Sequence, residues 1–140
     1  MATGSDLIKF DVCLYKKDDV SYEDFIGWAT GPYAEQVIPL MKKHGLVKWV
    51  QTVVPPQFRE PLRQMLKGEM NRPGWTVPDY DLVHTYYLRS HDDLKALTLE
   101  PKWHELEEEA SKLSNVSIGH FVNGFEIVQF ENNYLETNNE

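Results

Sequence analysis

Residues 80–90, YDLVHTYYLRS, restrict the possible folds more than any other stretch of the chain. Their alternation predicts a strand in which His84 shares one face with Leu82, Tyr86 and Leu88, while the opposite face is also apolar or aromatic. A strand with this composition is typical of burial on both faces. The sheet that contains it therefore needs a cover on each side.

Three other segments also predict strands, and helical segments separate them. The four predicted strands cover residues 5–17, 46–54, 80–90 and 124–131. Helical spacing predicts helices after the N-cap residue Ser21, over 32–44 up to the stop at Gly45, over 57–70, and over 91–114 with a break at Pro101. This order predicts an α+β fold of the ferredoxin-like type, βαββαβ with an extra short helix, in which four antiparallel strands carry helices on one face.

Helices on one face leave the other face of the 80–90 strand without a cover. A second copy of the same sheet would supply it by two-fold symmetry. We therefore expect a homodimer held by sheet-to-sheet packing.

The composition narrows the classes of partner. The chain has 140 residues, which we assign to a single domain with a core of about 6–131 and a polar C-terminal tail. The net charge of −8, without a basic cluster, predicts no nucleic-acid partner. No apolar run approaches the ~20 residues that span a bilayer, so we expect no membrane segment. The start of the chain lacks the pattern of a signal peptide, and we expect a cytoplasmic protein.

Common cofactor and metal motifs do not occur in the sequence. It holds one cysteine, Cys13, and no pair of histidines at ligand spacing. It also lacks a Gly-rich nucleotide loop and a Gly-x-Ser-x-Gly elbow. We therefore expect no metal and no cofactor, and a serine hydrolase is not indicated.

The predicted strand 5–17 has an unusual second face. Ile8, Phe10, Val12 and Leu14 form its apolar face, and the other face carries the following polar or reactive residues: Asp11, Cys13 and Tyr15. This face either lines a pocket or is a solvated surface on which Asp11 pairs with a lysine. The residues alone leave both alternatives open.

His84 is the most informative of the five histidines. Burial would lower its pKa and an acidic neighbour would raise it, and a value near neutrality suits a general acid or base. Strands 5–17 and 80–90 are neighbours in the predicted sheet, so Asp11 is the candidate partner. The alternative is a histidine that only packs in the core or at the dimer interface.

Aromatic residues are numerous for a chain of this size. A pocket lined by flat rings suits a flat, fused-ring substrate, although an aromatic core would show the same composition. The candidate substrate-binding residues are Tyr15, Trp28, Tyr33, Trp49, Tyr86 and Trp103.

Three stretches of the sequence resemble the EthD-domain group of the dimeric α/β-barrel proteins. They are YEDFIGW followed by GPYAEQVIPLMKKHGLVKWVQT, then VPDYDLVHTYYLRSHDDLKAL, then EPKWHELEEEASKL. The resemblance is strongest to fungal EthD-type decarboxylases and dehydratases of aromatic polyketide pathways. One position departs from that pattern, because Thr30 or Tyr33 stands where the family usually has a histidine.

The resemblance implies a dimeric α/β barrel with a ligand cavity between the sheet and the helices. The implied function is a cofactor-independent lyase, first a decarboxylase and then a dehydratase, that acts on an aromatic polyketide in secondary metabolism. The alternatives are a cyclase, a cofactor-free oxygenase, or a binding protein for such an intermediate. The candidate catalytic residues are His84 and Asp11, from the strand patterns above, and His120, which the resemblance places in a loop at the cavity mouth, just before the predicted strand 124–131.

Overall fold

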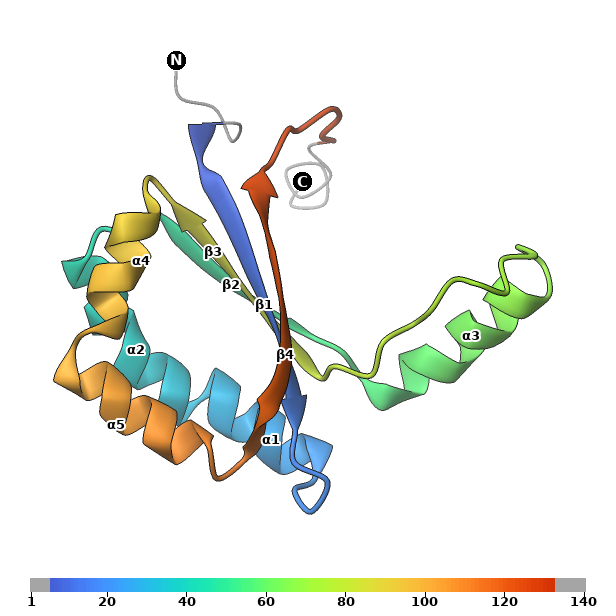
Figure 1. Cartoon of the computed structure of the whole chain (residues 1–140), viewed down its shortest axis with the longest axis horizontal. Helices are drawn as coiled ribbons and strands as arrows, with labels where there is room; N and C mark the ends of the chain where they lie inside the picture. Colours follow the sequence, from blue (N-terminus) through green and yellow to red (C-terminus); the bar gives the residue numbers. More distant parts are fainter. Residues whose placement is uncertain (1–5, 133–140) are drawn as a thin grey trace, which may run out of the picture.

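The computed structural model describes residues 6–132 and contains a four-stranded antiparallel sheet (Figure 1). The strands are β1 (Ile8–Lys16), β2 (Lys48–Val53), β3 (Leu82–Leu88) and β4 (Ser114–Phe125). Their order across the sheet is β2-β3-β1-β4, so that β3 and β1 are the central pair. This topology confirms the predicted α+β, ferredoxin-like fold.

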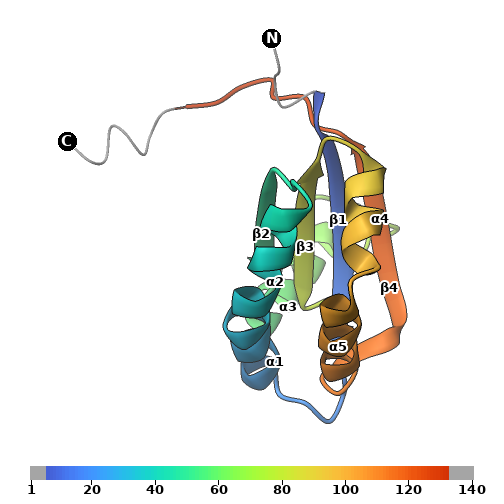
Figure 2. The ribbon, with the colours of Figure 1, turned by 90° about the vertical axis from the view of Figure 1, so that its left-hand side faces the viewer.

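Four helices form a layer on one face of this sheet, as Figure 2 shows from the helix side. They are α1 (Tyr22–Thr30), α2 (Pro32–Lys43), α4 (His91–Thr98) and α5 (Pro101–Ala110). A 3₁₀ turn, η2 (Pro56–Phe58), leads into α3 (Arg59–Lys67), which extends away from the sheet on the opposite side (Figure 1). None of the helices within residues 6–132 has the length and apolar character needed to cross a membrane.

Local signals in the sequence set the helix ends. The Ser21 hydroxyl accepts a hydrogen bond from the Asp24 amide at 3.0 Å, which confirms the predicted N-cap of α1. Pro32 and Pro101 stand in the first turns of α2 and α5, where a missing N–H has no helical partner to lose. Gly45 adopts a φ of +72° just after α2 and confirms the predicted stop.

The core lies between the sheet and the helix layer. Alternation along β1 and β3 directs one face of each strand toward the helices. The core consists of two buried clusters, and Trp28 packs against both of them. The larger cluster contains Tyr33, Val37, Met41, Tyr86, Leu88, Leu97 and Leu106. The smaller cluster contains Phe25, Ala29 and Leu82.

The last strand differs from its prediction. The sequence pattern placed it at 124–131, whereas β4 covers Ser114–Phe125 and residues 126–132 have no regular structure. The register gives the reason, because Phe125 pairs with Ile8, the first residue of β1, and residues beyond 125 have no strand beside them. Alternation alone does not make a strand where a pairing partner is missing. Most of the predicted polar tail, 133–140, lies outside the described residues.

Candidate active site

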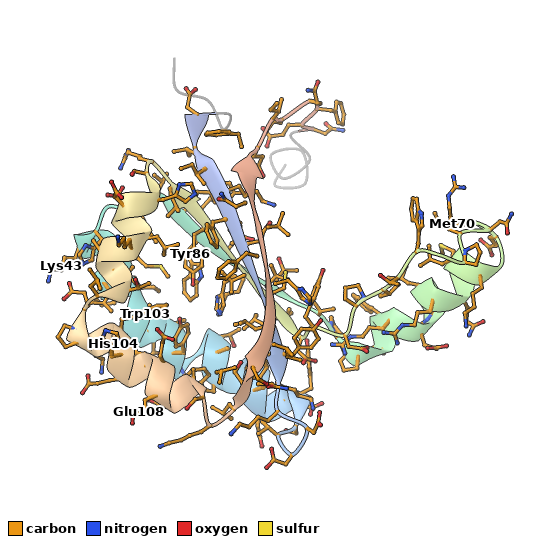
Figure 3. All side chains as sticks on the ribbon, in the orientation of Figure 1. Lys43, Met70, Tyr86, Trp103, His104 and Glu108 are labelled. Carbon is orange, nitrogen blue, oxygen red and sulfur yellow. The ribbon has the colours of Figure 1, made fainter. Side chains whose placement is uncertain are left out.

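A cavity of about 340 Å³ lies between the sheet and the helix layer. This volume falls within the ~300–1,000 Å³ typical of small-molecule sites. Residues of β1, β3 and β4 provide one wall, and α1, α2, α4 and α5 provide the other. Its aromatic lining residues are Phe10, Phe25, Trp28, Tyr33, Tyr86, Trp103 and Phe121. Figure 3 shows Tyr86 and Trp103 pointing into the space between the sheet and α5.

His84 provides a polar group in the sheet wall of this cavity. It is 4% exposed, and burial lowers the pKa of its imidazole to about 4, so the ring is neutral at pH 7. The indole Nε1 of Trp49 donates a hydrogen bond to its Nδ1 at 3.1 Å. The two rings are stacked, with centroids 5.3 Å apart and planes 15° apart.

Two buried phenols flank the imidazole. The ring centroids of Tyr33 and Tyr86 lie 5.7 Å and 6.2 Å from that of His84. Burial raises the pKa of both hydroxyls, and the negative charge of Glu107 raises both further. Both are therefore neutral groups that can donate or accept hydrogen bonds at pH 7.

Glu107 is the one carboxylate among the described residues that line the cavity. It stands on α5 at the solvent side of the cavity and accepts a hydrogen bond from the indole of Trp103 one turn earlier. Glu107 is exposed to solvent and also contributes to the lining of the cavity. Sequence reasoning did not single out Glu107, although it is four residues after the candidate Trp103 and therefore on the same side of the helix.

The cavity gathers five of the predicted site residues: His84, Trp28, Tyr33, Tyr86 and Trp103. Trp49 is not among the lining residues and packs behind His84, which it contacts as described above. The remaining three, Asp11, His120 and Tyr15, lie elsewhere.

Asp11 does not contact His84, which corrects the pairing expected from the sequence. In the register of β1 with β3, Asp11 pairs with Thr85 and Val12 pairs with His84. Adjacent register positions point to opposite faces of a sheet, so Asp11 faces away from the cavity. There it accepts a hydrogen bond from Thr85 at 2.5 Å and pairs with Lys9 at 3.3 Å. Asp11 thus lies outside the cavity and pairs with a lysine, and its side chain is 14% exposed in the single chain.

His120 and Tyr15 also lie on the face away from the helices. The sequence analysis expected His120 in a loop at the cavity mouth, but it lies within β4 and pairs with Cys13. Its Nε2 is 2.9 Å from the Tyr15 hydroxyl. Phe121, the next residue, takes the place at the cavity wall because side chains alternate along β4.

The charges around the cavity restrict what it can bind. Its lining contains neither a lysine nor an arginine within the described part of the chain. Over residues 6–132 there is also no cluster of three or more His, Cys, Asp or Glu side chains arranged to hold a metal ion. The titratable side chains in the described lining are thus the His84 imidazole, the Tyr33 and Tyr86 phenols and the Glu107 carboxylate, and Thr98 and Ser114 add hydroxyl groups.

The fold is that of an α+β protein with a cavity between its sheet and its helices, and sequence comparison assigns the protein to a family. Residues 17–117 match the EthD domain, and the chain belongs to the EthD domain family. The dehydratase iacD of Pestalotiopsis fici is 31% identical over 97 residues, which cover 69% of this chain and 69% of that protein.

Solved structures share the fold at low sequence identity. A dimeric ferredoxin-like protein of unknown function from Bacteroides fragilis has a TM-score of 0.56 at 15% identity, with 86% of this chain and 97% of that chain covered. The hydroxynitrile lyase of Passiflora edulis has a TM-score of 0.55 at 12% identity, covering 91% and 99%. SnoaB, a cofactor-independent oxygenase from Streptomyces nogalater, has a TM-score of 0.51 at 11% identity, covering 90% and 96%.

Proposed function

We propose that this protein is a cofactor-independent lyase, a dehydratase that removes water from a β-hydroxy ketone of an aromatic polyketide intermediate. The observation that carries the proposal is the combination of Glu107 and neutral His84 in one aromatic cavity. A carboxylate and a hydrogen-bond donor are the two groups that such an elimination needs. The likeness to a fungal dehydratase supports the same reaction class.

The charge of the cavity favours dehydration over decarboxylation, which the sequence analysis had placed first. A substrate carboxylate would enter a cavity whose lining holds Glu107 and no cation. A buried charge without a counter-ion is strongly unfavourable, and a second carboxylate nearby adds repulsion. An uncharged hydroxy ketone avoids both penalties.

The elimination would proceed through an enolate. The Glu107 carboxylate takes a proton from the carbon next to the ketone, and the electron pair moves onto the carbonyl oxygen. A hydrogen bond from His84 stabilises the negative charge that develops there. The enolate then re-forms the carbonyl, a carbon–carbon double bond forms, and the carbon–oxygen bond to the hydroxyl breaks. The leaving hydroxyl receives the proton held by Glu107 and departs as water, which restores the carboxylate.

The aromatic walls suit a flat, multi-ring substrate. The rings of Trp28 and Tyr33 lie 5.0 Å apart, and Phe10 meets Phe121 edge-on at 5.0 Å. Aromatic surfaces of this kind bind fused rings by stacking and edge contacts. The product of dehydration would gain conjugation while held between them.

The protein would act as a homodimer. The helix layer covers one face of the sheet, and on the other side α3 extends away from it (Figure 1), where β3 carries Val83 and Tyr87. A second copy packed on that face would give the barrel expected from the sequence.

Product analysis by mass spectrometry tests this function. The purified protein is incubated with a pair of aromatic polyketides that share one ring system, of which one is a β-hydroxy ketone and the other the related β-keto acid. We expect loss of water from the hydroxy ketone, and this activity should fall in His84→Ala and persist in His120→Ala, a histidine outside the cavity. Loss of carbon dioxide from the keto acid, with the hydroxy ketone unchanged, would instead identify a decarboxylase. Addition of oxygen would identify an oxygenase.

A further inference from the structure

The contact between Trp49 and His84 determines which ring nitrogen carries the proton. The indole Nε1 lies 3.1 Å from Nδ1 of the imidazole, and an indole nitrogen can only donate a hydrogen bond. Nδ1 must therefore be the acceptor, and in a neutral imidazole the proton then resides on Nε2. A proton on Nδ1 would bring two N–H groups face to face.

We propose that Trp49 is a positioning residue that holds His84 in the Nε2–H tautomer, so that the cavity receives a hydrogen-bond donor from this side chain and not a base. The proposal rests on the proposed function for its catalytic meaning and on geometry for the tautomer. It assigns the proton abstraction to Glu107, because Nε2 of this tautomer has no free lone pair.

The packing around both rings keeps them in place. Trp49 and His84 are stacked, and Tyr33 meets Trp49 edge-on at 6.2 Å between centroids. Trp49 pairs with Tyr86 in the β2–β3 register, while Gln51, opposite His84, donates its amide to the Ala29 carbonyl at 3.0 Å. The Gln51 amide nitrogen is thus already engaged, and Trp49 is the partner that selects the tautomer.

The groups facing the imidazole from the other elements do not reverse this preference. Tyr33 on α2 and Tyr86 on β3 are neutral phenols, and Glu107 on α5 stands at the solvent side of the cavity. Burial lowers the pKa of His84, which keeps the ring in its neutral form at pH 7. Protonation of Nδ1 would also break the hydrogen bond from Trp49.

Nitrogen NMR of the protein labelled at its histidines tests the tautomer without any substrate. Long-range ¹⁵N–¹H correlations at pH 7 should show a protonated Nε2 and an unprotonated Nδ1 for His84, identified by the signal missing in His84→Ala. A protonated Nδ1, or a doubly protonated ring, would overturn the proposal. A correct tautomer in a protein that dehydrates no hydroxy ketone would count against the proposed function alone.

Trp49→Phe tests the positioning role. Phenylalanine keeps a stacking ring and removes the N–H, so the Nδ1–H tautomer should become populated and turnover should fall about three- to tenfold. The matched control is Trp75→Phe, in the loop that follows α3. It should leave both the His84 tautomer and turnover unchanged. An unaltered His84 tautomer in a folded Trp49→Phe protein would contradict the role.

A second variant keeps the test valid if Trp49→Phe fails to fold. The indole proton of Trp49 should shift in His84→Ala and stay in place in His120→Ala, because only His84 accepts its hydrogen bond. An indole signal that does not respond to loss of His84 would show that this hydrogen bond is not formed.

Discussion

Asp11 and His84 lie one register step apart on paired strands and therefore on opposite faces of the sheet, with Asp11 opposite Thr85 and Val12 opposite His84. Asp11→Asn should consequently leave turnover within about twofold of the wild type. It weakens a hydrogen bond from Thr85 and the pair with Lys9, so the free energy of unfolding should fall by about 1 kcal/mol or less. Steady-state kinetics and urea unfolding on the same preparation measure both effects. A tenfold loss of turnover would contradict this result and indicate that Asp11 takes part in catalysis.

His84→Ala should lower turnover by at least about tenfold while the protein stays folded and keeps its oligomeric state. The variant removes the donor that stabilises the enolate, and the loss of one such group commonly slows a reaction ~10²–10³-fold. Turnover and molecular mass are measured on one sample. A weaker assembly with unchanged turnover would indicate that His84 serves packing alone.

The stability of the protein should fall on acidification because His84 is buried neutral. Its pKa is about 4 in the folded protein against 6.5 in the reference state. The unfolded chain therefore binds a proton more readily between these values, and this contribution to stability is complete above pH 6.5 and lost as the pH falls to 4. The expected loss is about 3 kcal/mol. Urea unfolding at a series of pH values measures it.

Two histidine variants separate this effect from the titration of the carboxylates. In His84→Gln the decline in unfolding free energy between pH 6.5 and 4 should be shallower than in the wild type. His104→Gln, on the exposed side of α5, should keep the wild-type slope. Equal slopes in all three proteins would contradict a neutral buried His84.

A homodimer through the face of the sheet that lacks helices should appear in light scattering as about twice the chain mass at micromolar concentration. Val122 on β4 pairs with Asp11, and so lies on that face; it is 59% exposed in the single chain. Val122→Glu should give the monomer mass because it places a charge on the surface that a second copy would bury. Leu99→Glu, between α4 and α5, is the control and should remain dimeric. A wild-type monomer would contradict the dimer.

The strands with strong alternation could be predicted from sequence, and the final strand could not. β1 shows one regular apolar face and β3 is apolar or aromatic on both faces, and these patterns predict that both segments are strands. Residues 114–125 mix Gly, Ser and Asn with apolar residues that stay exposed, and their strand depends on pairing with β1. The stronger pattern at 124–131 has no neighbour to pair with.

The residues of the candidate site also divide into those that could be predicted from sequence and those that could not. Trp28, Tyr33 and Trp103 could be predicted because large rings at helical spacing point inward. The placement of Asp11 and His84 on opposite faces could not be predicted. Alternation does not fix the pairing register of two strands, and a shift of one residue moves a side chain to the other face. The partner of His84 is an indole from the neighbouring strand, and a search for acidic partners does not find it.

The most direct test of the account compares water loss from a β-hydroxy ketone by three proteins: the wild type, Glu107→Gln and Glu108→Gln. Both glutamates lie on α5, but Glu107 lines the cavity and Glu108 does not. Figure 3 shows Glu108 on the side of α5 that faces away from the sheet. Loss of a general base typically slows a reaction ~10²–10⁴-fold, so Glu107→Gln should fall by this factor while Glu108→Gln matches the wild type. Equal rates for all three proteins, or no water loss by the wild type, would contradict the proposed dehydration in this cavity.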